Sequence, residues 1–222
     1  MIGLRRGVVG KTVDPNLKLE LKFNTNTFTD LLGNDPAGAN DYVRSWRSTV
    51  GGHLLTQAMD AARPQRVSDG IYFDGGDGLS TPFVLATRSP WTFEWWQYDS
   101  NNTNTVGMVT ISPDKLYLEW FTQTFYLGDG FTNNIAFATT RPVATWYHLA
   151  VSFDGTTYRL YKNGIQLIST ATALQAATST SIEIGNRTTM PCYMLGKLTD
   201  IRFYNSCIYP NGTTFTPPTR SA

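Results

Sequence analysis

The acidic side chains of this chain are the first candidates for chemistry, because enzymes that hydrolyse glycosidic bonds need two carboxyl groups close together. One carboxyl group protonates the leaving oxygen, and the other acts as the nucleophile or activates water. A strand supplies such a pair when two acidic residues stand a few positions apart on one face. The glutamates occur singly instead, at Glu20, Glu94, Glu119 and Glu183. The sequence therefore predicts a protein that is not a glycosidase.

Nucleophilic catalysis finds little support in the histidines and cysteines. His53 lies in a glycine-rich stretch, and His148 follows an aromatic pair in a strand-like run, where a structural role is favoured. Cys192 and Cys207 have no histidine near them in sequence, so an activated thiol is not expected. The nucleophile-elbow pattern is absent, although a Ser-His-Asp arrangement built from distant segments stays open.

The two cysteines are expected to be free thiols. A strand predicted over residues 196–204 would hold them about 30 Å apart, at about 3.3 Å per residue. The Cα atoms of a disulfide lie within about 7 Å of each other. An internal bridge is therefore disfavoured.

Asp74 and Asp77 are the candidates for a metal site. They form Asp74-Gly-Gly-Asp77, which presents hard oxygen ligands of the kind that calcium prefers. A turn at Asp74-Gly75 explains the same residues without a metal, since glycine accepts the backbone conformation of a tight turn. We therefore predict no metal and no other cofactor, with calcium as the alternative.

Exposed aromatic side chains beside Asp and Asn residues are candidates for binding a glycan, because the flat face of a sugar stacks on an aromatic ring. The candidates are Tyr98, Trp120, Tyr126 and Asp129, together with the polar loops at 101–104 and 129–134. The competing interpretation places the aromatic rings in the core or at a subunit contact. Because the chain has six tryptophans, the core is favoured for the aromatic residues as a group.

Alternating apolar residues show which strands must position these side chains. Residues 17–23 alternate apolar and charged side chains without a break, which predicts a half-buried strand. Residues 146–153 follow the same period, with residues 147, 149, 151 and 153 on one face. Tight turns are predicted at Asp154-Gly155 and Asn163-Gly164, so residues 146–169 should form an antiparallel meander. Further strands are predicted at 91–98, 106–111, 115–121, 123–127, 181–185 and 196–204.

Three segments carry a family resemblance. Residues 146–155 read Trp-Tyr-His-Leu-Ala-Val-Ser-Phe-Asp-Gly and are followed by Tyr161-Lys-Asn-Gly164. Residues 42–77 contain Trp46, Gly51 and the run Phe73-Asp-Gly-Gly-Asp77, and residues 196–204 read Gly-Lys-Leu-Thr-Asp-Ile-Arg-Phe-Tyr. These runs resemble the motifs of the concanavalin A-like lectin/glucanase superfamily, in its laminin-G-like branch. The resemblance covers residues 17–219.

The resemblance implies an all-β fold, namely an antiparallel two-sheet jelly-roll sandwich. It implies one domain over residues 16–222, behind an N-terminal arm of residues 1–15, and extended chain in preference to a short helix at 54–62. The sequence departs from the family at Arg47-Ser-Thr-Val-Gly51, where members often have Asp-x-Ser-Gly, so any role of that Asp is absent. The ending Phe215-Thr-Pro-Pro218 resembles phage-associated members. The sandwich also hosts lectins, glycosidases and adhesion modules, so the fold leaves function open.

Charge and hydropathy exclude two classes of partner. With 18 basic and 17 acidic side chains the net charge is +1, and nucleic-acid binding normally needs a basic face. No apolar run reaches about 18 residues, so no membrane-spanning helix is expected. The first ten residues lack the apolar stretch of a secretory signal, which predicts synthesis in a host cytoplasm.

The N-terminal arm is expected to dock on a partner chain. Its glycines and lack of periodicity give it no strand or helix of its own, and ordering it costs backbone entropy that new contacts must offset. The arm residues proposed to make these contacts are Ile2, Leu4, Arg5, Arg6, Val8 and Lys11. We expect a non-enzymatic structural protein of a virion, most simply a bacteriophage capsid decoration protein that binds the major capsid protein or another virion protein and forms a homo-oligomer. The alternative is a module of a phage tail fibre or bacterial surface protein that binds a glycan or receptor.

Overall fold

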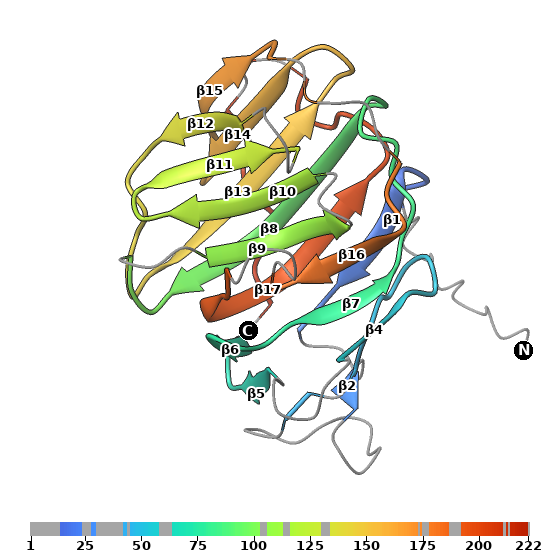
Figure 1. Ribbon diagram of the computed structural model, residues 1–222, viewed down its shortest axis with the longest axis vertical. Coiled ribbons are helices and arrows are strands. Elements are labelled where there is room, and N and C mark those ends of the chain that lie inside the picture. The colour runs from blue at the N-terminus through green and yellow to red at the C-terminus, as the bar shows by residue number, and fades with distance from the viewer. Residues whose placement is uncertain are drawn as a thin grey trace, which may run out of the picture.

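The protein folds into two antiparallel β-sheets that pack face to face, as a computed structural model shows (Figure 1). The structure describes residues 14–23, 28–29, 42–43, 45–57, 64–102, 106–112, 116–129, 134–172, 174, 178–186, 192–210, 212 and 214–221. Throughout these residues the paired strands run antiparallel and no helix occurs, so none could span a membrane. The predicted two-sheet sandwich is confirmed.

We call the sheet nearer the viewer in Figure 1 the front sheet and the other one the back sheet. The front sheet has nine strands in the order β12-β11-β10-β9-β16-β7-β4-β3-β2. Its strands are β2 (Phe28–Thr29), β3 (Ser45–Arg47), β4 (Leu54–Thr56), β7 (Leu79–Pro82), β9 (Val106–Ser112), β10 (Leu116–Phe121), β11 (Thr124–Gly128), β12 (Asn134–Ala138) and β16 (Ser181–Ile184).

The back sheet has eight strands in the order β15-β14-β13-β8-β17-β6-β5, and β1 pairs with β17 off this path. Its strands are β1 (Leu17–Leu21), β5 (Gln65–Val67), β6 (Gly70–Asp74), β8 (Trp91–Asp99), β13 (Trp146–Phe153), β14 (Tyr158–Lys162), β15 (Ile165–Thr170) and β17 (Leu195–Tyr204). The meander predicted over 146–169 is therefore confirmed as β13, β14 and β15.

The core lies between the inner faces of the two sheets. Trp95 of the back sheet stacks on Phe125 of the front sheet, with ring centroids 6.3 Å apart. Residues 147, 149, 151 and 153 of β13 are buried in this core, which confirms the predicted face. Burial of these large apolar side chains is the main source of stability in such a sandwich.

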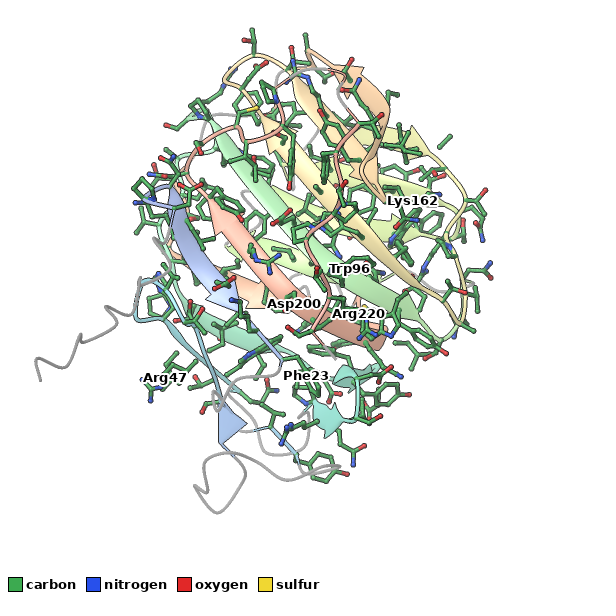
Figure 2. All side chains as sticks on the ribbon, turned by 180° about the vertical axis from the view of Figure 1, so that it is seen from behind. Phe23, Arg47, Trp96, Lys162, Asp200 and Arg220 are labelled. Carbon is green, nitrogen blue, oxygen red and sulfur yellow. The ribbon has the colours of Figure 1, made fainter. Side chains whose placement is uncertain are left out.

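Part of the outer face of the back sheet is buried as well, which strand alternation did not predict. His148 and Ser152 of β13 point outward and are completely buried. The C-terminal segment, which we define as residues 205–210, 212 and 214–221, runs over this face (Figure 2). The Phe215 ring centroid lies 5.9 Å from that of His148, and Cys207 Sγ lies 3.0 Å from Ser152 Oγ. Phe215 N donates to Gly164 O (2.9 Å), and the Trp96 indole N–H donates to Pro218 O (3.0 Å).

Gly164 permits this close approach. Its φ is +78°, as the tight turn between β14 and β15 requires. A Cβ atom at this position would overlap the carbonyl group of Phe215. The turn glycine that the hairpin pattern predicted thus also holds the C-terminal segment against the sheet.

Three other sequence predictions, and one strand that was not predicted, are compared here with the structure. Residues 54–56 form β4, so the chain there is extended, while most of the alternative helix over 54–62 lies outside the described residues. Strand β12 was not predicted, because its short run Asn-Ile-Ala-Phe-Ala has little β propensity outside Ile135 and Phe137. Cys192 and Cys207 are thiols that form no disulfide bond with each other, as expected. Residues 1–13, with all the arm residues proposed for docking, lie outside the described residues.

Candidate functional site

The outer face of the front sheet carries the side chains best suited to bind a ligand. On β10, Tyr117, Glu119 and Phe121 point away from the core, because the alternate residues Leu118 and Trp120 are completely buried. Phe121 is 54% exposed. Tyr117 and Glu119 are only 4% and 8% exposed, so Phe121 is the side chain that β10 exposes on this outer face.

An aromatic pair forms one part of this face. Tyr126 of β11 lies opposite Glu119 in the ladder. Its ring centroid is 6.4 Å from that of Phe121, with an interplanar angle of 75°. The arrangement places the exposed Phe121 ring beside the half-buried Tyr126 ring and its hydroxyl. These groups can pack on the C–H face of a sugar and bond one of its hydroxyl groups.

Gly128 shapes the neighbouring part of the face. It stands on β11 between Tyr117 of β10 and Asn134 of β12 in the ladder. The Tyr117 hydroxyl donates a hydrogen bond to Asn134 Oδ1 across it, and a Cβ atom at residue 128 would overlap both side chains. The absence of a side chain here lets the Tyr117 ring lie over β11. We call Tyr117, Glu119, Phe121, Tyr126 and Asn134 the β10–β12 face.

The four residues proposed for glycan contact do not form one site. Of these, Tyr126 alone belongs to the β10–β12 face. Tyr98 lies on the outer face of the back sheet, where Lys197 Nζ is 4.6 Å from the centroid of its ring. Trp120 is completely buried in the core and Asp129 is 2% exposed, so neither presents its side chain to a ligand. Phe121 was missed, although an inward Trp120 requires an outward Phe121.

Asp74 and Asp77 form a turn. Asp77 Oδ2 accepts a hydrogen bond from the Asp74 backbone N–H (2.8 Å). Burial and the negative charge of Asp74 raise the pKa of Asp77 to about 6. No cluster of three or more metal-binding side chains occurs among the residues that the structure describes. The turn explains the hydrogen bond between the two residues without a metal ion.

Two glutamates that are far apart in sequence meet through Arg202. Arg202 Nε lies 2.9 Å from Glu20 Oε1, and its Nη1 lies 3.4 Å from Glu94 Oε1. The strand order β1-β17-β8 brings the three side chains together on the outer face of the back sheet. Sequence spacing gave no sign of this pair, because 74 positions separate the two glutamates (94 − 20).

Their surroundings hold both carboxyl groups in the ionised form. Burial favours the neutral acid, but hydrogen bonds from Thr49 and Arg202 lower the pKa of Glu20 below its ordinary value. Glu94 is completely buried, yet His148, Tyr209 and Arg202 lower its pKa in the same way. His148 Nε2 lies 3.4 Å from Glu94 Oε2, and the Tyr209 hydroxyl donates to the same oxygen (2.6 Å). A glycosidase acid needs a raised pKa, so this pair suits structure and not acid catalysis.

The other two glutamates share the outer face of the front sheet but stand on separated strands. Glu119 is on β10 and Glu183 on β16, with β9 between them. Neighbouring strands lie about 4.8 Å apart, so the two backbones are about 10 Å apart across the sheet. Retaining glycosidases need carboxyl groups about 5 Å apart. The strand spacing therefore argues against a retaining pair.

The family assignment follows from a match over most of the sandwich. A model of the concanavalin A-like lectin/glucanases superfamily matches residues 73–211, which is more than half of the 222 residues. The chain belongs to this superfamily. The matched range includes β13 and β17, where two of the three motif segments lie, and the end of the third segment at residues 73–77. A search of curated proteins gave no match.

Solved structures of the same fold include enzymes and binding proteins. A sialidase from Trypanosoma rangeli superposes with a TM-score of 0.63 at 15% identity, over 88% of this chain and 31% of that one. Domain 4 of an extracellular arabinanase from Geobacillus stearothermophilus, solved with arabinotriose, gives 0.56 at 16% identity, over 86% and 93%. A SAP-like pentraxin from Limulus polyphemus gives 0.51 at 14% identity, over 62% and 76%. The chain spans less than a third of the sialidase, and at these identities the likeness shows the fold alone.

Proposed function

We propose that the chain is a non-enzymatic recognition module with a lectin-like sandwich, and that it works on the surface of a virion. The single observation that carries the recognition part is the β10–β12 face. It combines the exposed Phe121 ring with the half-buried Tyr126 ring and the exposed Asn134 amide on rigid strands. Sites built on strands hold their side chains with little loss of entropy on binding.

The non-enzymatic part rests on the state of the carboxylates. Arg202 and its neighbours hold Glu20 and Glu94 ionised and buried. Asp99 lies in a fully buried ion pair with Arg141 between the sheets. Glycoside hydrolysis needs an acid and a nucleophile or base that both reach the same bond. Neither the Glu20 and Glu94 pair nor the Asp99 and Arg141 pair provides an acid and a nucleophile or base at one bond.

A glycan array tests the recognition part. We expect the wild-type protein to bind at least one glycan, and Phe121→Ala to weaken that binding about tenfold, since an aromatic contact contributes up to about 1.5 kcal/mol and about 1.4 kcal/mol is a factor of ten. Leu167→Ala is the matched control, because Leu167 is also exposed but lies on β15 of the back sheet. Equal binding by Phe121→Ala and wild type would show that the β10–β12 face is not the binding site.

The virion setting rests on the resemblance of the ending Phe215-Thr-Pro-Pro218 to phage-associated members of the superfamily. In that setting the arm of residues 1–15 anchors the protein, as a homo-oligomer, to the major capsid protein or another virion protein, and the sandwich faces outward. Deletion of residues 2–13 should leave a folded sandwich that no longer joins particles. Undiminished occupancy of the deletion variant on particles, counted by electron microscopy, would refute the anchor.

A further inference from the structure

A cavity of about 600 Å³ opens at the edge of the sandwich, and it shares no residue with the β10–β12 face. Its lining combines β1, the end of β17 and the segment between β7 and β8. Phe83, Leu85 and Phe203 in this lining belong to the buried core. The lining residues that are exposed to a partner are Pro82, Val84, Ala86, Ser89, Pro90, Thr180 and Asn205.

Residues 82–86 present an open backbone edge beside this cavity. The segment continues the pairing of β7 with β16, because Phe83 N donates to Thr180 O (3.1 Å). In an antiparallel ladder the N–H and C=O groups of successive residues point to opposite sides, so those of Val84 point away from β16. On that side lies β4, which pairs with β7 at Ser80, and no described strand pairs with Val84. Val84 therefore offers its N–H and C=O groups to a further extended chain.

The side chains along this edge are apolar and open to contact. Val84 is 74% exposed, the largest fraction among the large apolar side chains that the structure describes. Pro82 and Ala86, two positions away on either side, are exposed as well. An edge with free backbone groups and uncharged apolar side chains is a place where an extended segment adds to a sheet.

The chain that precedes β1 is the nearest segment able to fill this place. Leu17 N donates to Asp14 O (3.0 Å) and Asn16 N donates to Asp14 Oδ1 (2.8 Å), which closes a turn over residues 14–17. A turn reverses the chain, so a segment that enters it from the N-terminal side is directed back along β1, where Lys18 lines the cavity. A segment tethered this closely has an effective concentration in the millimolar range, so contacts of modest strength suffice to hold it.

The composition of the arm suits this edge. Residues 1–13 contain no proline, so every one of them has a backbone N–H group to donate. They contain no acidic residue either, and Val8, Val9, Thr12 and Val13 are β-branched residues of high strand propensity. The thirteen residues span about 40 Å when extended, at roughly 3.3 Å each, which is ample to reach a cavity that Lys18 already lines.

The geometry points to the arm of the same chain as the occupant of this cavity in the free protein. The arm adds as a short extended segment beside residues 82–86, with its backbone paired to Val84 and its valines packed on the exposed apolar side chains. The cavity then stores the arm until a virion protein takes it up. That last consequence rests on the proposed function, in which the arm is the anchor, whereas the docking itself does not.

Trypsin cleavage after Lys11 tests the docking in the free protein. A protease cuts a docked segment only in the fraction of molecules in which it is released. A synthetic peptide of residues 1–16 gives the cleavage rate of the undocked segment. We expect the Lys11–Thr12 bond of the intact protein to be cut at least about tenfold more slowly than that of the peptide, as followed by mass spectrometry.

Three variants locate the docking site, each checked for folding by thermal melting. Val84→Asp places a charge on the apolar edge, and Ser89→Trp fills the cavity from an exposed position in its lining. Each should bring cleavage after Lys11 to within about threefold of the peptide rate. Val143→Asp is the matched control, because Val143 is exposed and lies outside the lining, next to Ala144, which bonds the far end of β8 at Asp99. It should leave the protection unchanged.

Three outcomes would overturn the proposal. The first is cleavage of the intact protein as fast as that of the peptide, and the second is protection that both Val84→Asp and Ser89→Trp leave intact. The third is protection that grows with protein concentration, which would assign the arm to the cavity of a second copy. The assay contains no particles, so its failure is distinguishable from a failure of the proposed anchor, which the deletion of residues 2–13 tests.

Discussion

The buried ion pair between Asp99 and Arg141 gives a quantitative test of how this sandwich is held together. Both side chains are completely buried, and Arg141 Nη2 lies 2.7 Å from Asp99 Oδ1. The Tyr147 hydroxyl and the Gln97 amide also donate to the Asp99 carboxylate. Asp99 thus accepts bonds from three side chains in a site without water contact.

Asp99→Asn keeps the shape of the side chain and removes its charge. The Arg141 guanidinium then loses the charge of Asp99, and the new Asn amide group can face another donor. Removal of one partner of a buried pair costs about 3 to 5 kcal/mol. For a chain of this size about 1 kcal/mol lowers Tm by about 2 to 4 °C, so we expect a loss on the order of 6 to 20 °C.

A double-mutant cycle separates the pair from its surroundings. Arg141→Met alone leaves the Asp99 carboxylate buried with two donors, so it should also destabilise the fold. The double variant Asp99→Asn with Arg141→Met buries no charge, and its free energy of unfolding should lie within about 1 to 2 kcal/mol of wild type. Urea unfolding followed by tryptophan fluorescence gives all four values. Losses that simply add, or an Asp99→Asn loss below about 1 kcal/mol, would refute the buried pair.

Three further predictions concern the carboxylates. The pKa of Asp77 is raised to about 6 in the fold, so protonation of Asp77 stabilises the fold most at and below about pH 4, and this stabilisation is lost as the pH rises towards 6. Asp77→Asn should therefore make Tm depend less on pH between about 4 and 6. An unchanged dependence of Tm on pH in this variant would contradict the assignment. Chelation by EDTA should leave Tm unchanged, because Asp74 and Asp77 serve a turn; a drop of several degrees that calcium reverses would show a bound ion. The purified protein should not hydrolyse β-glucans, and turnover that Glu119→Gln or Glu183→Gln abolishes would show an enzyme.

Much of the fold could be predicted because its signals are local. Alternation over residues 146–153 and the turn at Asn163-Gly164 depend only on neighbouring residues, and both appear in the structure. The burial of His148 could not be predicted this way. Its outward face is covered by the C-terminal segment, where Phe215 packs with its ring centroid 5.9 Å from the imidazole.

The candidate site was harder to predict because it depends on register between strands. Alternation places Trp120 and Phe121 on opposite faces of β10, but only the packing of the two sheets decides which face is outer. The proximity of Glu20 and Glu94 likewise needs the strand order β1-β17-β8. Gly128 shows no pattern of its own in the sequence, and its role appears only where Tyr117 crosses it.

The central claim is that the outer face of β10 and β11 binds a glycan without catalysis. The most direct measurement is calorimetric titration of the strongest glycan from the array against wild type, Phe121→Ala and Leu167→Ala. We predict saturable binding by wild type and Leu167→Ala, about tenfold weaker binding by Phe121→Ala, and a glycan recovered intact. A Kd that Phe121→Ala leaves unchanged, or a glycan cleaved during the titration, would contradict the account.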